Sequence, residues 1–123
     1  MPKRNLERMR ELLILAEGIE IDPEDSFEDG FVDIEDKLVR NDGYQLILMR
    51  DAEWIDGRDA NLGLFRVTNL GHEYLDATRQ AGVWEKVQSQ VKEQGGNVSL
   101  EIVKKLAIAF GKKQIEERTG LEL

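Results

Sequence analysis

The sequence of 123 residues contains no cysteine and a single histidine, His72. The missing cysteines exclude disulfides, thiolate nucleophiles and zinc sites built on sulfur. A metal site would therefore depend on His72 and carboxylates alone. A general base needs a positioned partner and a pocket, and the sequence identifies neither beside His72. We expect no metal, no cofactor and no catalytic residue, and a protein that is not an enzyme.

Long apolar runs are also missing. The longest, Leu12–Ala16, is far shorter than the roughly 20 residues that a membrane-spanning helix requires. The N-terminal segment is charged and lacks the apolar core of a signal peptide. We expect a cytoplasmic protein with no membrane partner, and the length indicates a single domain overall.

Positive charge is scarce, since the formal net charge is −8. Residues 19–36 carry nine carboxylates and no Lys or Arg, so the rest of the chain sums to +1. The stretch DPEDSFEDGFVD has proline at its second position and lacks the ligand order of a calcium-binding EF-hand loop. Mimicry of a nucleic acid backbone is an alternative, but we interpret the segment as a solvated acidic insertion. Such charge opposes DNA binding, although a basic face elsewhere would permit it.

What is present in the first half is helical periodicity. Apolar residues at spacings of three and four predict a helix from about residue 2 or 3 to Glu17, with Gly18 as a left-handed stop. A second, short helix is predicted over Val32–Val39. After a tight turn, Asp42 is expected to cap a third helix over Gly43–Asp51. Two helices around a tight turn form a helix-turn-helix outline.

A β-hairpin is predicted next, with strands at Trp54-Ile55 and Leu64–Val67 around a polar tip. Thr68 stands where a helix N-cap belongs, and Gly71 would let the first turn of the following helix approach the hairpin closely. His72 falls outside the apolar stripe of that helix, so we interpret it as a surface residue.

Two more helices are predicted in the last third, the first with a stripe of Val83, Trp84, Val87 and Val91 that ends at Gly95-Gly96. Asn97 or Ser99 is expected to cap the second. The predicted fold class is α+β and mostly helical. It has a winged helix-turn-helix core of three helices plus a hairpin wing over residues 1–82, and a helical extension over 83–123 that packs on the core or forms a dimer interface.

Three stretches carry a resemblance to a known family: YQLILMRDAEWI at 44–55, FRVTNLGHEYLDATR at 65–79 and VWEKVQSQVKEQGGNVSLEIVKKLAI at 83–108. They resemble the bacterial and prophage proteins grouped as domain-of-unknown-function family 2513, over roughly residues 37–115. The departures are Glu53 and Trp54, where that family's pattern has Gly and Leu, and the acidic stretch 19–36. The resemblance implies a winged-helix-like core and carriage on phage or prophage elements. It implies no activity, so no catalytic residue is carried over.

Two functional hypotheses remain open at this stage. The first is a DNA-binding transcriptional regulator, whose helix over Gly43–Asp51 would lie in the major groove of double-stranded DNA. Its expected contacts with DNA are Gln45 and Arg50 on base edges, Arg40 and Arg58 on phosphates, and Tyr44.

The second hypothesis is a protein-interaction module on the same scaffold, because four consecutive apolar residues in that helix leave at least one facing outward. Its partner would be a basic host or phage protein, or a second copy in a homodimer. The expected interface residues lie on this helix and on the C-terminal helix: Ile47, Leu48, Phe110 and Ile115.

Overall fold

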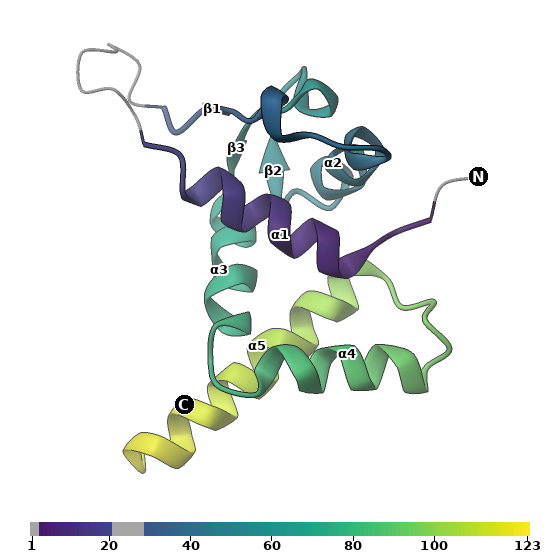
Figure 1. Cartoon of the computed structure of the whole chain (residues 1–123). Coiled ribbons are helices and arrows are strands. Elements are labelled where there is room, and N and C mark those ends of the chain that lie inside the picture. The colour runs from purple at the N-terminus through teal and green to yellow at the C-terminus, as the bar shows by residue number, and fades with distance from the viewer. Residues whose placement is uncertain (1–2, 21–28) are drawn as a thin grey trace. The chain divides into compact units, whose positions relative to one another are not determined.

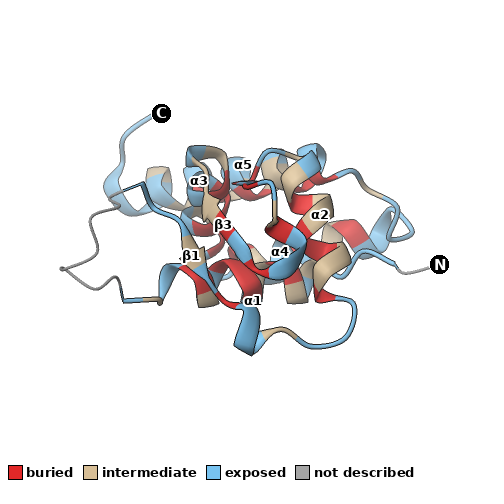
Figure 2. Ribbon diagram, turned by 90° about the horizontal axis from the view of Figure 1, so that it is seen from above, coloured by how far each residue is buried: buried red, intermediate tan, exposed pale blue. Residues whose placement is uncertain are grey.

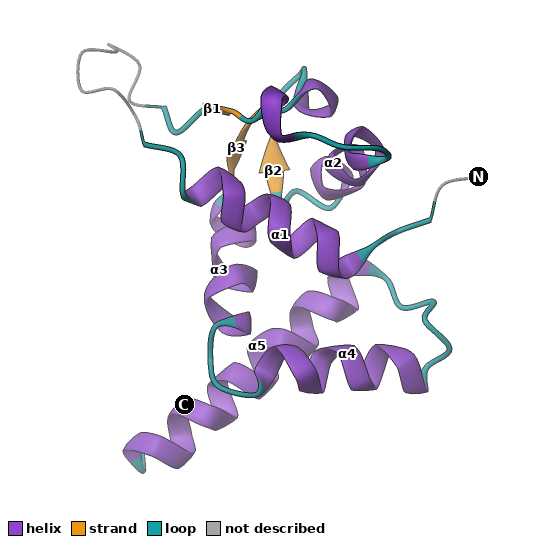
Figure 3. Cartoon of the chain, in the orientation of Figure 1, coloured by secondary structure: helices purple, strands orange, loops and turns teal. Residues whose placement is uncertain are grey.

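The computed structural model describes residues 3–20 and 29–123. In that part of the chain the fold is mostly helical α+β, with a three-stranded antiparallel sheet (Figure 3). The elements in chain order are α1 (Leu6–Glu17), β1 (Val32–Asp33), the 3₁₀ helix η1 (Glu35–Lys37), α2 (Asp42–Asp51), β2 (Ile55–Asp56), the 3₁₀ helix η2 (Ala60–Leu62), β3 (Leu64–Val67), α3 (Asn69–Thr78), α4 (Val83–Glu93) and α5 (Leu100–Thr119).

The chain divides into two compact units, one up to His72 and one from Glu73. The boundary between the units falls inside α3, whose first turn belongs to the first unit. The sequence predicted a boundary between residues 82 and 83. Each unit is described separately below.

Helix α1 begins where Asn5 caps it, because the Asn5 side chain accepts a hydrogen bond from the Arg8 backbone N–H. The helix ends at Gly18 with φ −78°, in the right-handed region. The expected left-handed stop is therefore wrong, since a right-handed turn closed by the Gly18 N–H on the Ile14 carbonyl already satisfies the helix end. The buried side is a single stripe: Met9, Leu12, Leu13 and Ala16.

The sheet has the order β1-β3-β2, with Val32 opposite Phe65 and Ile55 opposite Val67. The helix predicted over Val32–Val39 is wrong. Residues 32–33 pair with β3 instead, and only the three residues of η1 form a helical turn. The Ile34 N–H donates to the Gly63 carbonyl, and this tertiary bond overrides the local helical pattern. Of the acidic insertion over 19–36, residues 21–28 lie outside the described residues.

Helix α2 starts at Asp42, after Asn41 in the left-handed region (φ 70°), so Asp42 is the first residue of the helix and not its cap. The hairpin was predicted correctly at β3, and β2 begins one residue later than expected. Its loop contains η2, which packs against α2. A Cβ at Gly43 would lie 3.0 Å from the Asn61 carbonyl oxygen, so the loop approaches the helix closely.

The junction between β3 and α3 is as predicted. The Thr68 hydroxyl accepts a hydrogen bond from the Gly71 N–H at 3.2 Å, as an N-cap should. A Cβ at Gly71 would lie 2.2 Å from the Trp54 carbonyl oxygen, so glycine is needed for this approach.

Figure 2 shows buried residues along one side of α1 and α2. The largest side chains of this core are Trp54, Phe65, Met9, Leu12, Leu13, Ile34, Leu46, Met49 and Ile55.

In the second unit α4 packs against α5 (Figure 1). Val83, Val87 and Val91 are buried on α4, as their spacing predicted, whereas Trp84 of the same predicted stripe is half-buried. Ser99 caps α5 by accepting a hydrogen bond from the Ile102 N–H at 3.3 Å. Helix α5 continues without interruption through Gly111 to Thr119.

Within the described residues, no helix combines the length and the apolar character needed to cross a bilayer.

Candidate interaction surfaces

Gln45 was expected to read base edges, but its side chain is inside the fold at 2% exposure. Its Nε2 donates to the Lys3 carbonyl at 2.9 Å, and its Oε1 accepts from the Asn5 N–H at 2.8 Å. Gln45 therefore anchors the segment before α1 to α2. A buried side chain whose amide oxygen and nitrogen are both hydrogen-bonded within the fold cannot reach a base pair, so this expectation is corrected.

Arg50 was the second expected base contact. Its guanidinium donates to the carbonyls of Gly57 and Arg58, at 3.2 and 3.0 Å, and so holds the hairpin loop against α2. Arg50 therefore has a role inside the fold, and reaching a base edge would cost the protein these two bonds.

A second polar network joins α1 to the start of α2. The Arg8 Nε and NH2 groups donate to the two carboxylate oxygens of Asp42, at 2.9 and 2.8 Å, and the Val39 N–H donates to the same carboxylate at 2.7 Å. Pairing with Arg8 holds the pKa of the buried Asp42 carboxyl below its usual range and raises the pKa of Arg8. The exposed Glu11 also accepts from Arg8, at 3.0 Å.

The two residues expected on phosphates are both exposed. Arg40 lies in the turn before α2, and the Arg58 side chain is 93% exposed in the hairpin loop. Arg58 lies 3.9 Å from the carboxylate of Asp59. The neighbouring carboxylate reduces the positive potential that Arg58 offers to a phosphate.

The side of α2 that faces away from the core is formed by four residues, here called the α2 outer face: Tyr44, Ile47, Leu48 and Asp51. At 100° per residue they lie opposite the buried stripe of Leu46 and Met49. The first three are half-buried and Asp51 is exposed. This surface is thus apolar with one negative charge, and none of its four residues is a cation.

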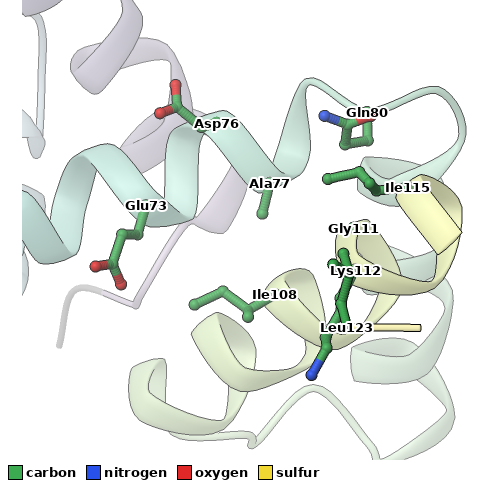
Figure 4. Close-up of a pocket in the computed structure, with 9 residues that line it drawn as sticks. All are labelled: Glu73, Asp76, Ala77, Gln80, Ile108, Gly111, Lys112, Ile115 and Leu123. Carbon is green, nitrogen blue, oxygen red and sulfur yellow. The ribbon is translucent and has the colours of Figure 1, made fainter. Parts of the chain in front are cut away.

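A groove lies in the second unit between α3 and α5, with a volume of about 490 Å³ (Figure 4). The expected interface residue Ile115 lines it together with Ile108, and both are more than one-third exposed. Phe110 does not line the groove and is half-buried. At the edge, the Lys104 Nζ lies 3.3 Å from Glu73. The lining residues are Glu73, Asp76 and Ala77 of α3, Gln80 just after α3, Ile108, Gly111, Lys112 and Ile115 of α5, and Leu123.

One exposed surface was missed from the sequence. Phe31, Leu62 and Leu64 are 44%, 51% and 37% exposed, and they are here called the apolar patch. The sequence offered one indication of it, an aromatic residue within the acidic run. Without knowledge of β1, nothing connected Phe31 to the hairpin thirty residues later.

His72 is an exposed residue of α3, as expected, with its Nδ1 3.9 Å from a Glu17 carboxylate oxygen. Among the described residues, no three His, Asp or Glu side chains gather in a way that could hold a metal ion.

The family described as "Hypothetical protein (DUF2513)" matches residues 3–97. The chain belongs to this family, in agreement with the resemblance found in its sequence. Neither the curated proteins nor the solved structures contain a match to it.

Proposed function

We propose that this protein is a protein-interaction module, and that the α2 outer face is its contact surface. One observation carries the proposal. The polar residues of α2 that would read DNA are used to hold the fold together, while Tyr44, Ile47 and Leu48 are left partly exposed. Aromatic and aliphatic side chains with few charges are typical of the centre of a protein–protein interface.

The scaffold we propose is a winged helix. That fold runs helix, strand, helix, helix, strand, wing, strand, and its first strand pairs with its last. The first unit runs α1, β1, η1, α2, β2, loop, β3, with β1 beside β3. The short η1 stands in the place of the first helix of the helix-turn-helix, and α2 in the place of the reading helix.

DNA binding is the second candidate function, favoured by this element order and by the exposed Arg40 and Arg58. Charge opposes it. Residues 1–72 hold nine Lys and Arg against seventeen Asp and Glu, a formal charge of −8. Protein–DNA affinity comes largely from neutralised phosphates, and an acidic unit lacks that contribution.

A site-specific photo-crosslinker tests the proposal. Tyr44 is replaced by benzoylphenylalanine, an aromatic residue of related shape, and the protein is irradiated in an extract of its source cells. The control carries the same group at the exposed Lys86 of α4. We expect a discrete protein adduct at position 44 that is lost when Ile47→Asp is added. Equal labelling at position 86, or an adduct that survives Ile47→Asp, would contradict the proposed interface.

The DNA alternative is tested by the anisotropy of a labelled random duplex at about 50 and 200 mM salt. A DNA-binding winged helix should bind at the lower salt and lose affinity steeply at the higher salt. We expect no binding at either salt. Salt-sensitive binding that is reduced by Arg40→Ala and Arg58→Ala would instead favour the second candidate function.

A further inference from the structure

We propose that the outward face of the three-stranded sheet is a second docking surface, which binds a Lys- or Arg-rich segment of a partner protein that also carries apolar side chains. This surface consists of the apolar patch (Phe31, Leu62, Leu64) and the carboxylates around it. It is distinct from the α2 outer face, so the proposal goes beyond the proposed function and does not depend on it.

The register of the sheet determines which residues share this face. Phe65, opposite Val32, is fully buried and marks the inward side. Side chains alternate along a strand, so the pair Asp33 and Leu64 must point outward. Phe31 precedes Val32 and has the same outward direction as Asp33. Phe31 and Leu64 are therefore diagonal neighbours on adjacent strands, within reach of each other.

Leu62 extends the patch beyond the end of the strands. It belongs to η2, next to Gly63, whose carbonyl accepts the Ile34 N–H. A Cβ at Gly63 would lie 2.8 Å from the Glu35 nitrogen, so the turn at 62–63 lies directly against the start of η1. The three exposed apolar residues thus border the same strand–turn junction.

Negative charge is concentrated beside this patch. Residues 29–37 contain four exposed carboxylates (Asp29, Asp33, Glu35, Asp36) and one cation, Lys37. Asp33, Glu35 and Asp36 line a common shallow depression. Arg66 of β3 shares the outward face with Leu64, and it lies 3.4 Å from Asp56 of β2, so this arginine already has an anionic partner.

This combination selects the chemistry of the occupant. Exposed apolar side chains favour a protein surface that can cover them. The excess of carboxylates repels nucleic acid and anionic lipid, and attracts a cationic segment by complementary charge. Apolar contacts supply the affinity of such a complex, and the carboxylates supply its charge preference and its sensitivity to salt.

A pair of synthetic peptides tests this surface on the full chain. One is a fluorescein-labelled peptide of repeated Leu-Lys-Lys-Leu units, and the other has Glu in place of every Lys. Each is titrated with the protein at about 50 mM salt, and binding is followed by anisotropy. We expect binding of the Lys peptide only. No binding of the Lys peptide, or equal binding of the two peptides, would overturn the proposal.

Variants locate the binding to the patch. Leu64→Ser and Phe31→Ser remove apolar contacts, and each should weaken Lys-peptide binding roughly tenfold, the value of one apolar side chain partly buried in an interface. Asp33→Asn keeps the oxygen that accepts the Glu35 N–H and removes only the charge. It should weaken binding about two- to fivefold, as an exposed charge pair would.

Matched controls lie in the second unit. Leu121→Ser removes an apolar side chain that is 62% exposed, and Glu85→Gln removes an exposed charge from α4. Both should bind the Lys peptide like the unmodified protein. Equal losses in patch and control variants would show general acidic attraction and overturn the docking surface. Circular dichroism checks that every variant remains folded. Because Ile47→Asp leaves the patch intact, it should not change peptide binding, so failure of the α2 interface and failure of this proposal are distinguishable.

Discussion

Asp42 is a single carboxylate that receives hydrogen bonds from two directions, from Arg8 on α1 and from the backbone of Val39 before α2. It is buried, so removing its charge leaves the partly buried guanidinium with the exposed Glu11 as its remaining anion. We expect Asp42→Asn to lower the free energy of unfolding by about 3 kcal/mol, the usual cost of breaking such a pair. Urea denaturation at pH 7 measures this loss.

Glu11→Gln provides the control, because Glu11 also accepts from Arg8 but is exposed. It should cost less than about 0.5 kcal/mol, as surface ion pairs do. The role of Asp42 as the main anchor of Arg8 would be contradicted if the two variants lost equal stability.

The same carboxylate predicts an acid-sensitive fold. The folded pKa of Asp42 is depressed, so its contribution to stability is complete above the unfolded pKa of about 3.9 and is lost as pH falls through the folded pKa. The stability gap between the unmodified protein and Asp42→Asn should therefore be constant from pH 7 to about 5 and narrow below about pH 4. A gap that stays constant down to pH 2 would contradict the depressed pKa.

Gly71 is required for a steric reason. In Gly71→Ala the new methyl would lie 2.2 Å from the Trp54 carbonyl oxygen, a backbone atom that cannot rotate away. We expect the free energy of unfolding, measured by thermal denaturation, to fall by about 3 kcal/mol or more. Gly18→Ala is the matched control, because Gly18 has an ordinary helical φ and no contact closer than 3.4 Å. It should be neutral or slightly stabilising, and similar losses in both variants would contradict the steric explanation.

At the scale of elements, Gln45 ties the segment before α1 to α2 through the Lys3 carbonyl and the Asn5 N–H. Gln45→Ala should cost about 1–2 kcal/mol and accelerate amide exchange at Asn5. Gln88→Ala, on the exposed side of α4, should change neither. Amide exchange at Asn5 that is unchanged in Gln45→Ala would mean that the segment is held by other contacts.

The elements that the sequence predicted correctly depend on local chemistry. Strand β3 and the Thr68 cap are specified by adjacent residues, and the close approach at Gly71 by the missing side chain of that one residue. The two-residue strand β1 is specified by its partner Leu64 and by a bond to Gly63, thirty residues away, so local periodicity assigned a helix there instead.

The candidate sites divide in the same way. Four consecutive apolar residues in a helix cannot all face the core, which predicts an outward Ile47, and the structure leaves Ile47 partly exposed. The residue type of Gln45 is typical of a base contact, whereas its helical spacing with Leu46 and Met49 predicts a place in the buried stripe. Helical phase was therefore the better guide at this position. The apolar patch needed tertiary pairing and could not have been assembled from the sequence.

At the scale of the whole molecule, charge is unequally divided. Residues 1–72 sum to −8, whereas residues 73–123 hold eight cations and eight carboxylates and are neutral. The electrostatic attraction of a cationic partner, which we propose above, therefore comes from the first unit alone. In the α3–α5 groove the apolar contacts available to a partner are those of Ile108 and Ile115.

The family match ends at residue 97, between α4 and α5. The second unit does not end there, because Val83, Val87 and Val91 of α4 are buried and α4 packs against α5. A chain of residues 1–97 would expose this valine stripe to water, and an isolated helix of 11 residues is marginal. We therefore expect α4 to unfold in that chain.

Amide exchange distinguishes this loss from general unfolding. In residues 1–97 the α4 amides, including Val87, should lose protection, while those of α1, α2 and β3 keep it because their core lies in the first unit. Residues 1–119 form the control, since that chain retains the whole of α5. Protected α4 amides in residues 1–97 would mean that the region matched by the family folds as a complete unit, and that α5 is an addition to it. Loss of protection confined to α4 would mean that α5 is needed to complete the fold of the matched region.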